Sequence, residues 1–112
     1  MNAFKQLFAD LDPLLHERGR LAIVSVLAAV EALTFTDLRD QLGMTDGNLS
    51  VHLQKLEEKG YVAIDKRFVG KRPCTSVSVT ARGRRAFAAH VAYLRDLLDG
   101  ASAGPNPAGD EP

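Results

Sequence analysis

The sequence predicts a small, mainly helical domain that carries one β-hairpin, an α+β fold. Apolar residues recur every three to four positions along most of the chain, the spacing of amphipathic helices. Between residues 61 and 79 they recur at every second position, the spacing of strands. A chain of 112 residues has room for one domain with a single core. We expect this domain to span 1–99 and a disordered, Gly- and Pro-rich tail to occupy 100–112.

The first long helix is predicted to begin at Asp12 and Pro13 and to run to about Ala32. Asp is a good N-cap residue, and Pro suits the first helical position because its missing N–H has no helical partner there. The second half, LAIVSVLAAV, is apolar almost all the way round. An amphipathic surface helix needs only one apolar stripe, so this pattern indicates that two surfaces cover the helix.

The next segment predicts two short helices joined by a tight turn. We expect Thr36 to cap a helix over 37–42, which Gly43 ends, and Thr45 to cap a second helix over 46–59. The turn between them has three residues and contains a glycine, which is typical of a helix-turn-helix. The apolar residues expected to hold the two helices together are Leu38, Leu42, Leu49, Leu53 and Leu56.

A hairpin and a last helix complete the predicted domain. Two β-prone runs, 61–68 and 75–79, flank the sequence VGKRP at 69–73, whose Gly and Pro are typical of a hairpin tip. Thr80 is expected to cap a final helix over 81–98. A hairpin in this position is the wing of a winged helix-turn-helix.

The net charge of zero conceals a strong segregation of charge along the chain. Residues 61–98 hold eight basic and two acidic side chains, whereas residues 1–60 hold six basic and nine acidic ones. Exposed charges act over about a Debye length of 8 Å, so a basic region can attract phosphate although the whole chain is neutral.

The motifs occur in the order and with the gaps of a known family. The stretches LDPLLHERGRLAIVSVL, FTDLRDQLGMTDGNLSVHLQKLEEKGYV and KRFVGKRPCTSVSVTARGRRAF together span most of residues 11–98. They resemble the MarR-like winged-helix transcriptional regulators, in particular a compact branch of ArsR-like size. The resemblance implies a homodimeric regulator, with repression the expected mode, that binds double-stranded DNA. We also expect no cofactor and, because no apolar run is long enough to cross a membrane, a cytoplasmic location.

The resemblance also implies which residues contact DNA. The helix over 46–59 would lie in the major groove, and the wing at 66–73 would contact the backbone or the minor groove. Three arginines open the last helix, where they oppose its macrodipole, so phosphate contact is the expected reason for them. The predicted DNA-binding residues are Thr45, Asn48, Ser50, His52, Gln54, Lys55, Lys66, Arg67, Lys71, Arg72 and Arg82.

Helices at both ends of the chain are expected to form the dimer interface. Residues 2–9 have the pattern of a short amphipathic helix, and the last helix carries one apolar stripe. Two recognition helices held in this way would read half-sites about 10 to 10.5 base pairs apart. The predicted interface residues are Phe4, Leu7, Phe8, Phe87, Val91, Leu94 and Leu98.

Two alternatives remain open at this stage. The same fold serves in some proteins as a protein interaction module. His16, His52, His90 and Cys74 also raise the possibility of a metal- or redox-responsive sensor of the ArsR type, although closely spaced pairs of soft ligands are absent. A small-molecule effector is possible, but no feature of the sequence supports one.

Catalytic and membrane functions find no support in the sequence. It contains no G-x-S-x-G elbow, no phosphate-binding glycine loop and no H-E-x-x-H motif, so an enzyme is not expected. No apolar run approaches the roughly 18 residues that a membrane span requires. We therefore expect neither a catalytic site nor a membrane partner.

Overall fold

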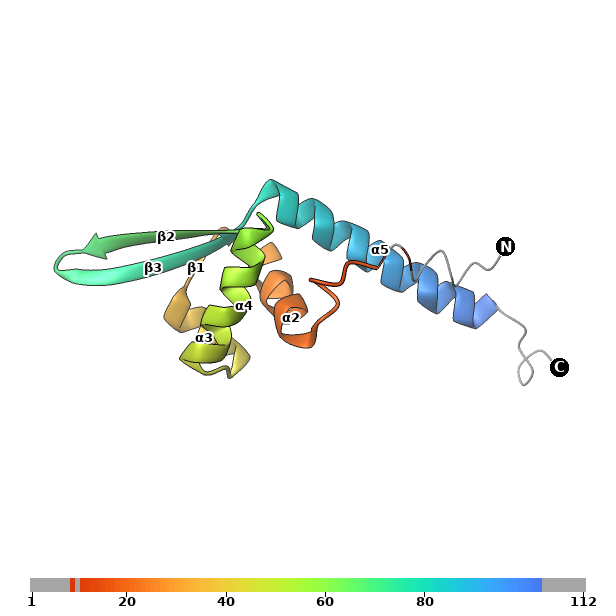
Figure 1. Ribbon diagram of the computed structural model, residues 1–112, viewed down its shortest axis with the longest axis horizontal. Helices are drawn as coiled ribbons and strands as arrows, with labels where there is room; N and C mark the ends of the chain where they lie inside the picture. Colours follow the sequence, from red (N-terminus) through yellow and green to blue (C-terminus); the bar gives the residue numbers. More distant parts are fainter. Residues whose placement is uncertain (1–8, 10, 104–112) are drawn as a thin grey trace.

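The computed structural model describes residue 9 and residues 11–103, and it shows a body of three helices from which a long hairpin and a long helix extend on opposite sides (Figure 1). The three strands form one antiparallel sheet in the order β1-β3-β2. This is the predicted α+β winged helix-turn-helix. The elements are α2 (Arg18–Ala28), β1 (Leu33–Thr34), α3 (Phe35–Leu42), α4 (Asp46–Glu58), β2 (Val62–Val69), β3 (Arg72–Val79) and α5 (Ala81–Ala103).

The prediction that the first long helix begins at Pro13 is wrong. The Asp12 carboxylate accepts the backbone N–H groups of Leu14 and Leu15 at 2.9 and 3.3 Å, which closes a turn instead of a helix. Glu17 is the actual N-cap residue, and its side chain accepts the N–H of Arg20 at 2.8 Å. The helix also ends earlier than predicted, at Ala28.

A long-range hydrogen bond explains why Asp12 serves a turn. Its second carboxylate oxygen accepts the hydroxyl of Tyr61 at 2.6 Å, so Asp12 ties the segment before α2 to the base of the hairpin. Burial acts to raise the pKa of Asp12, but the Tyr61 hydroxyl and the two backbone N–H groups outweigh burial and lower it. Burial and the same hydrogen bond raise the pKa of Tyr61 to about 12, so the hydroxyl keeps the proton that it donates.

The start of α3 also differs from the prediction. Thr34, not Thr36, is the N-cap residue, and its hydroxyl accepts the N–H of Asp37 at 3.0 Å. Thr34 belongs to the short strand β1, which pairs with β3. Gly43 ends α3 in the left-handed conformation with φ 64°, as predicted. Thr45 caps α4, also as predicted, because its hydroxyl accepts the N–H of Asn48 at 3.1 Å.

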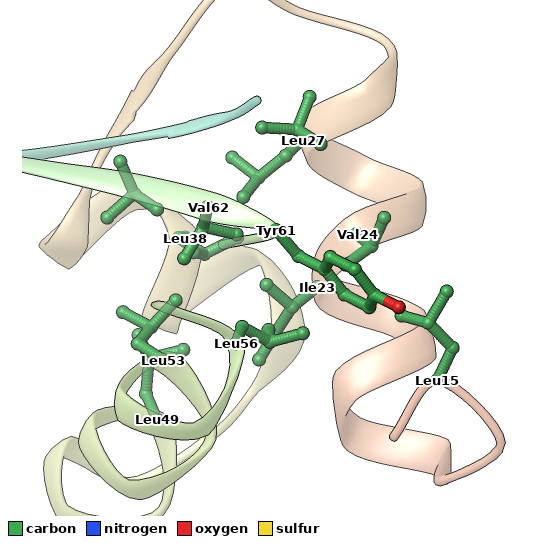
Figure 2. Packing of buried hydrophobic residues seen from close by; sticks show 12 residues of the cluster. Leu15, Ile23, Val24, Leu27, Leu38, Leu49, Leu53, Leu56, Tyr61 and Val62 are labelled. Carbon is green, nitrogen blue, oxygen red and sulfur yellow. The ribbon is translucent and has the colours of Figure 1, made fainter. Parts of the chain in front are cut away.

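One apolar core fixes α4 against the other helices and the sheet (Figure 2). Leu49, Leu53 and Leu56 are buried and point from α4 toward α2 and the start of β2. Their spacing of three to four residues places the polar residues between them on the outer side of the helix. The remaining buried members of this core are Leu15, Ile23, Val24, Leu27, Leu38, Tyr61, Val62, Val77 and Val79.

The hairpin is longer and more regular than the sequence indicated. β2 and β3 pair in one unbroken register from Val62 with Val79 to Val69 with Arg72, so β3 begins before the predicted Thr75. Gly70, with φ 66°, and Lys71 form a two-residue turn. A glycine at the first position of such a turn is typical of type II′ hairpins.

The first turn of α5 is clamped onto the backbone at the start of the hairpin. The N–H of Thr80 donates to the carbonyl of Tyr61 at 3.0 Å, and the hydroxyl of Thr80 donates to the carbonyl of Gly60 at 2.6 Å. The same hydroxyl accepts the N–H of Gly83 at 2.9 Å, which confirms Thr80 as the helix cap. A Cβ on Gly83 would overlap the carbonyl oxygen of Tyr61, so this contact requires glycine.

Beyond this clamp, α5 runs away from the helical body (Figure 1). The helix continues to Ala103, past the predicted end at Leu98 and into the predicted tail, of which 104–112 lie outside the described residues. None of the helices in the described ranges is long and apolar enough to cross a membrane.

A cluster of aromatic rings joins α5 to the turn before α2. The side chain of His90 is 2% exposed, and its ring centroid lies 5.4 Å from that of His16 and 5.7 Å from that of Tyr93. Within residue 9 and 11–103, neither ring nitrogen of His90 has a hydrogen-bond partner. Burial, followed by the charge of a nearby His16, lowers the pKa of His90, while Asp12 acts weakly in the opposite direction.

Substitution of two glycines tests the clamp. Gly83→Ala is expected to destabilise the protein by more than about 3 kcal/mol, since backbone must shift to admit the methyl group. Gly47→Ala is the matched control, because a Cβ on this helical residue of α4 would meet nothing within 4 Å. It is expected to stabilise the fold by about 0.5 to 1 kcal/mol. Urea denaturation measures both, and equal effects of the two substitutions would contradict the clamp.

The buried histidine predicts a loss of stability in mild acid. Because the pKa of His90 is lowered in the folded state, the unfolded chain binds the proton more tightly, and stability falls as the pH drops below the ordinary histidine pKa of 6.5. Each unit of lowering corresponds to about 1.4 kcal/mol. His90→Gln, which cannot bind that proton, is expected to flatten the dependence of the unfolding free energy between pH 7.5 and 5. An unchanged pH dependence in this variant would show that His90 is not the group responsible.

Candidate nucleic-acid interface

The outer face of α4 is a continuous row of exposed side chains. It lies opposite the buried leucines, so the core fixes its orientation. Most of these side chains carry hydrogen-bonding groups. Val51, which lies among them and is 52% exposed, offers an apolar contact of the kind that suits a thymine methyl group. The members of this face, called the α4 face below, are Thr45, Asn48, Ser50, Val51, Gln54 and Lys55.

The beginning of α4 is held by an ion pair with α3. The guanidinium of Arg39 donates to the carboxylate of Asp46 at 2.7 Å and to that of Asp40 at 3.0 Å. These two hydrogen bonds raise the pKa of Arg39. Asp46, the first residue of α4, thus links the two helices of the helix-turn-helix, while Thr45 provides the cap.

His52 was predicted to contact DNA, and in the structure its side chain also packs against the start of α2. Its ring is half-buried against the start of α2, with Nδ1 3.3 Å from Nη1 of Arg20 and 3.8 Å from a carboxylate oxygen of Glu17. A Cβ on Gly19 would lie 2.7 Å from Nε2 of His52. His52 therefore positions α4 against α2 and does not belong to the α4 face.

Arg20 holds the start of α2 against the preceding turn. Its Nε donates to the carbonyl of Leu14 at 2.8 Å. The backbone N–H of Arg20 is the first of the contacts that lower the pKa of Glu17. Glu17 and Arg20 of the segment HERGRL therefore pack against His52, in the middle of α4.

A groove of about 380 Å³ separates α4 from the hairpin. Ser50 and Gln54 line it from α4, and Lys66 and Thr75 line it from the two strands. The structure thus brings together three predicted DNA-binding residues that are up to 16 positions apart in the sequence.

The basic residues of the wing are all exposed, but they divide between its two faces. Because side chains alternate along a strand, Lys66 shares the face of Ile64, which lines the groove beside α4. Arg67 and Arg72 lie on the opposite face. There Arg67 donates to the carboxylate of Asp65, and this hydrogen bond raises the pKa of Arg67. Lys71 is exposed at the turn itself.

The arginines that open α5 have different environments. Arg84 donates to the carbonyls of Ala28 and Val30 at 3.0 and 3.3 Å, so it caps the end of α2 and is not left free for phosphate. Arg82 packs over Gly60, at the end of α4 opposite Thr45, a separation of about 20 Å along the helix. The structure does not bring Arg82 to the amino-terminal part of the α4 face.

The predicted dimer residues of α5 are incompletely covered. Phe87, Val91 and Leu94 are half-buried, and Leu98 is 67% exposed. A groove of about 470 Å³ runs along this helix between Phe87 and Asp99. The other predicted interface residues, Phe4, Leu7 and Phe8, lie outside the described residues.

The structure supplies no cluster suited to a metal ion in the part of the chain that it describes. No three His, Cys, Asp or Glu side chains gather there in a ligand arrangement. Cys74 is a half-buried free thiol in β3, paired across the sheet with Arg67.

A comparison with protein families decides the assignment. Residues 20–98, which include most of α2, all of α3, α4 and the hairpin, and most of α5, match the family model described as Winged helix DNA-binding domain. The chain belongs to this family. This winged helix domain is also 39% identical over 78 residues to the uncharacterized protein MJ0432 of Methanocaldococcus jannaschii, a match that covers 70% of this chain and 85% of that protein.

Solved structures share the same winged helix fold. The transcriptional regulator homologue protein of Pyrococcus horikoshii superposes with a TM-score of 0.79 at 28% identity and covers 89% of this chain and 97% of its own. A mutant MarR of Escherichia coli, in a structure with operator DNA, superposes with a TM-score of 0.67 at 21% identity, and the match covers 86% of this chain and 68% of MarR. MOSR of Mycobacterium tuberculosis, in complex with DNA, superposes with a TM-score of 0.65 at 22% identity, and the match covers 92% of this chain and 75% of MOSR. The predicted winged helix-turn-helix fold, which MarR shares, is confirmed, and the chain is a winged helix DNA-binding domain.

Proposed function

We propose that this chain acts as a homodimer that recognises a specific double-stranded DNA site and represses transcription there. The main support for DNA binding is that the α4 face lies beside the basic hairpin. Hydrogen-bonding side chains stand on a helix whose other side is locked into the core, and cations flank them. The MarR and MOSR structures that share the fold contain DNA, which supports the same partner for this chain.

The α4 face has the chemistry needed to read base edges in the major groove. Asn48 and Gln54 carry amides that can pair with N6 and N7 of adenine, and Ser50 can donate to or accept from several bases. Thr45 and the amino terminus of α4 suit a phosphate, because the first backbone N–H groups of a helix and its dipole favour an anion. The helix is then oriented by phosphate contacts and selects its sequence through the amides.

The hairpin supplies charge beside this helix. Lys66 projects from the same wing face as the groove along α4, and Lys71 stands at the turn. Lys and Arg that neutralise phosphates release counterions, so this contribution to binding falls steeply with salt and is nearly independent of sequence. We propose that the wing supplies affinity while α4 supplies selectivity.

The second subunit is proposed to pack along α5. This helix of 23 residues extends beyond the body (Figure 1). Its apolar stripe is half-buried at Phe87, Val91 and Leu94 and exposed at Leu98. Packing against a second copy would bury these side chains and set the distance between two α4 faces. A dimer bound in this way covers the DNA over two half-sites, which favours repression by steric exclusion.

Loss of the two amides is expected to reduce specific binding. With a duplex selected from a random library, Asn48→Ala and Gln54→Ala are each expected to weaken binding about 5- to 150-fold, the equivalent of about 1–3 kcal/mol for one bidentate pair. Gln41→Ala, an exposed amide on α3 outside the α4 face, is the matched control. Fluorescence anisotropy on the selected and an unrelated duplex gives the specificity ratio. If the amide variants retain that ratio, or the protein binds no duplex, the proposal fails.

The dimer is tested separately on the exposed end of α5. Leu98→Asp is expected to shift the protein from dimer to monomer, because it places a charge in the proposed interface while Leu98 makes little contact within its own subunit. Val69→Asp is the control, since Val69 is similarly exposed but lies on the wing. Sedimentation equilibrium measures the mass, and a dimer that survives Leu98→Asp unchanged would contradict the interface.

A further inference from the structure

Two large apolar side chains near the tip of the wing are exposed to solvent. Phe68 is 72% exposed and Val69 is 63% exposed, although both lie in a regular strand whose first residue, Val62, is buried. Neither packs against the hydrophobic core. Exposed apolar side chains next to a binding surface indicate contact with a partner.

The register of the hairpin places these two side chains on opposite faces. Phe68 lies directly across from Pro73 and shares the wing face of Ile64 and Lys66, which line the groove beside α4. Val69 lies across from Arg72 on the other face. Phe68 and Pro73 therefore form an apolar pair, called the tip pair below, on the face that continues outward from the groove.

The charges around the tip pair select a polyanionic partner. Lys66, Lys71 and Arg72 are exposed within a few residues of it. The one acidic residue of the hairpin, Asp65, is occupied by Arg67. An apolar surface surrounded by cations fits the sugars and base edges of a nucleic acid groove, because phosphates lie along both rims of such a groove.

We propose that Phe68, supported by Pro73, enters the minor groove beside the half-site read by α4 and wedges against a base step there. This inference rests on the proposed function. A pair of strands about 4.8 Å apart, with side chains added, is broader than the minor groove of B-DNA, about 6 Å wide. Entry therefore requires the groove to open, and an apolar wedge between bases opens it by bending the duplex toward the major groove.

The backbone at the tip is suited to this role. The two-residue turn at Gly70 keeps the hairpin narrow, and Pro73 lacks an N–H and has a fixed φ. Both features reduce the conformational freedom of the strand that backs Phe68. A wedge needs such stiffness, because a flexible tip would yield before the stacked bases do.

The experiment uses the full chain and its selected duplex, with 2-aminopurine at the flanking step and a pair of dyes at the duplex ends. Binding of the unaltered protein is expected to raise the 2-aminopurine fluorescence and to shorten the distance between the dyes. Phe68→Ala is expected to abolish both signals and to weaken binding about 10-fold, without changing the salt dependence. Val69→Ala, on the opposite face of the wing, is the matched control and is expected to retain both signals.

A second variant separates the wedge from the charge beside it. Lys71→Ala is expected to reduce the magnitude of the slope of log affinity against log salt by about 1 while leaving the 2-aminopurine signal in place. If Phe68→Ala binds and bends the duplex like the unaltered protein, the wedge is disproved while the proposed function stands. A change of oligomeric mass in Phe68→Ala with unaltered bending would likewise overturn it. Failure of the unaltered protein to bind any duplex would reject the proposed function and the wedge together.

Discussion

The clamp between the first turn of α5 and the backbone at Gly60 and Tyr61 is the contact on which the arrangement of this protein depends. At this point the end of α4, the start of β2 and the start of α5 meet. Thr80 bonds to both carbonyls, and Gly83 leaves no space between the helix and Tyr61. The positions of α4, the hairpin and α5 relative to one another are consequently fixed at this junction.

Two further contacts extend this junction to α2. Arg84 caps the last carbonyls of α2, and the Tyr61 hydroxyl bonds to Asp12 in the turn that precedes α2. A partner subunit that packs along α5 would therefore fix the position of α4 as well, because no flexible linker separates them. The spacing of two α4 faces would then be a property of the folded dimer, which is what recognition of two fixed half-sites requires.

The sequence predicted the elements whose signals are local and left out the contacts that depend on distant residues. The leucine spacing of α4, the cap at Thr45 and the glycine after α3 are each set within a few residues, and the structure confirms them. Asp12 and Thr36 looked like caps, but Asp12 forms a turn bonded to Tyr61 and Thr34 caps α3 from a strand that needs β3. The neighbours of His52 and Arg84 likewise lie on α2, which no local spacing reveals.

DNA binding by this protein requires the α4 face and the wing to contact a duplex together. The most direct test of this joint contact is the change in backbone amide chemical shifts of isotope-labelled protein when the selected duplex is added. Large changes are expected over residues 45–55 and 66–73, and small changes over the last turns of α5 that the structure describes. Changes confined to α5 or to α2, with the α4 face unaffected, would contradict the joint contact.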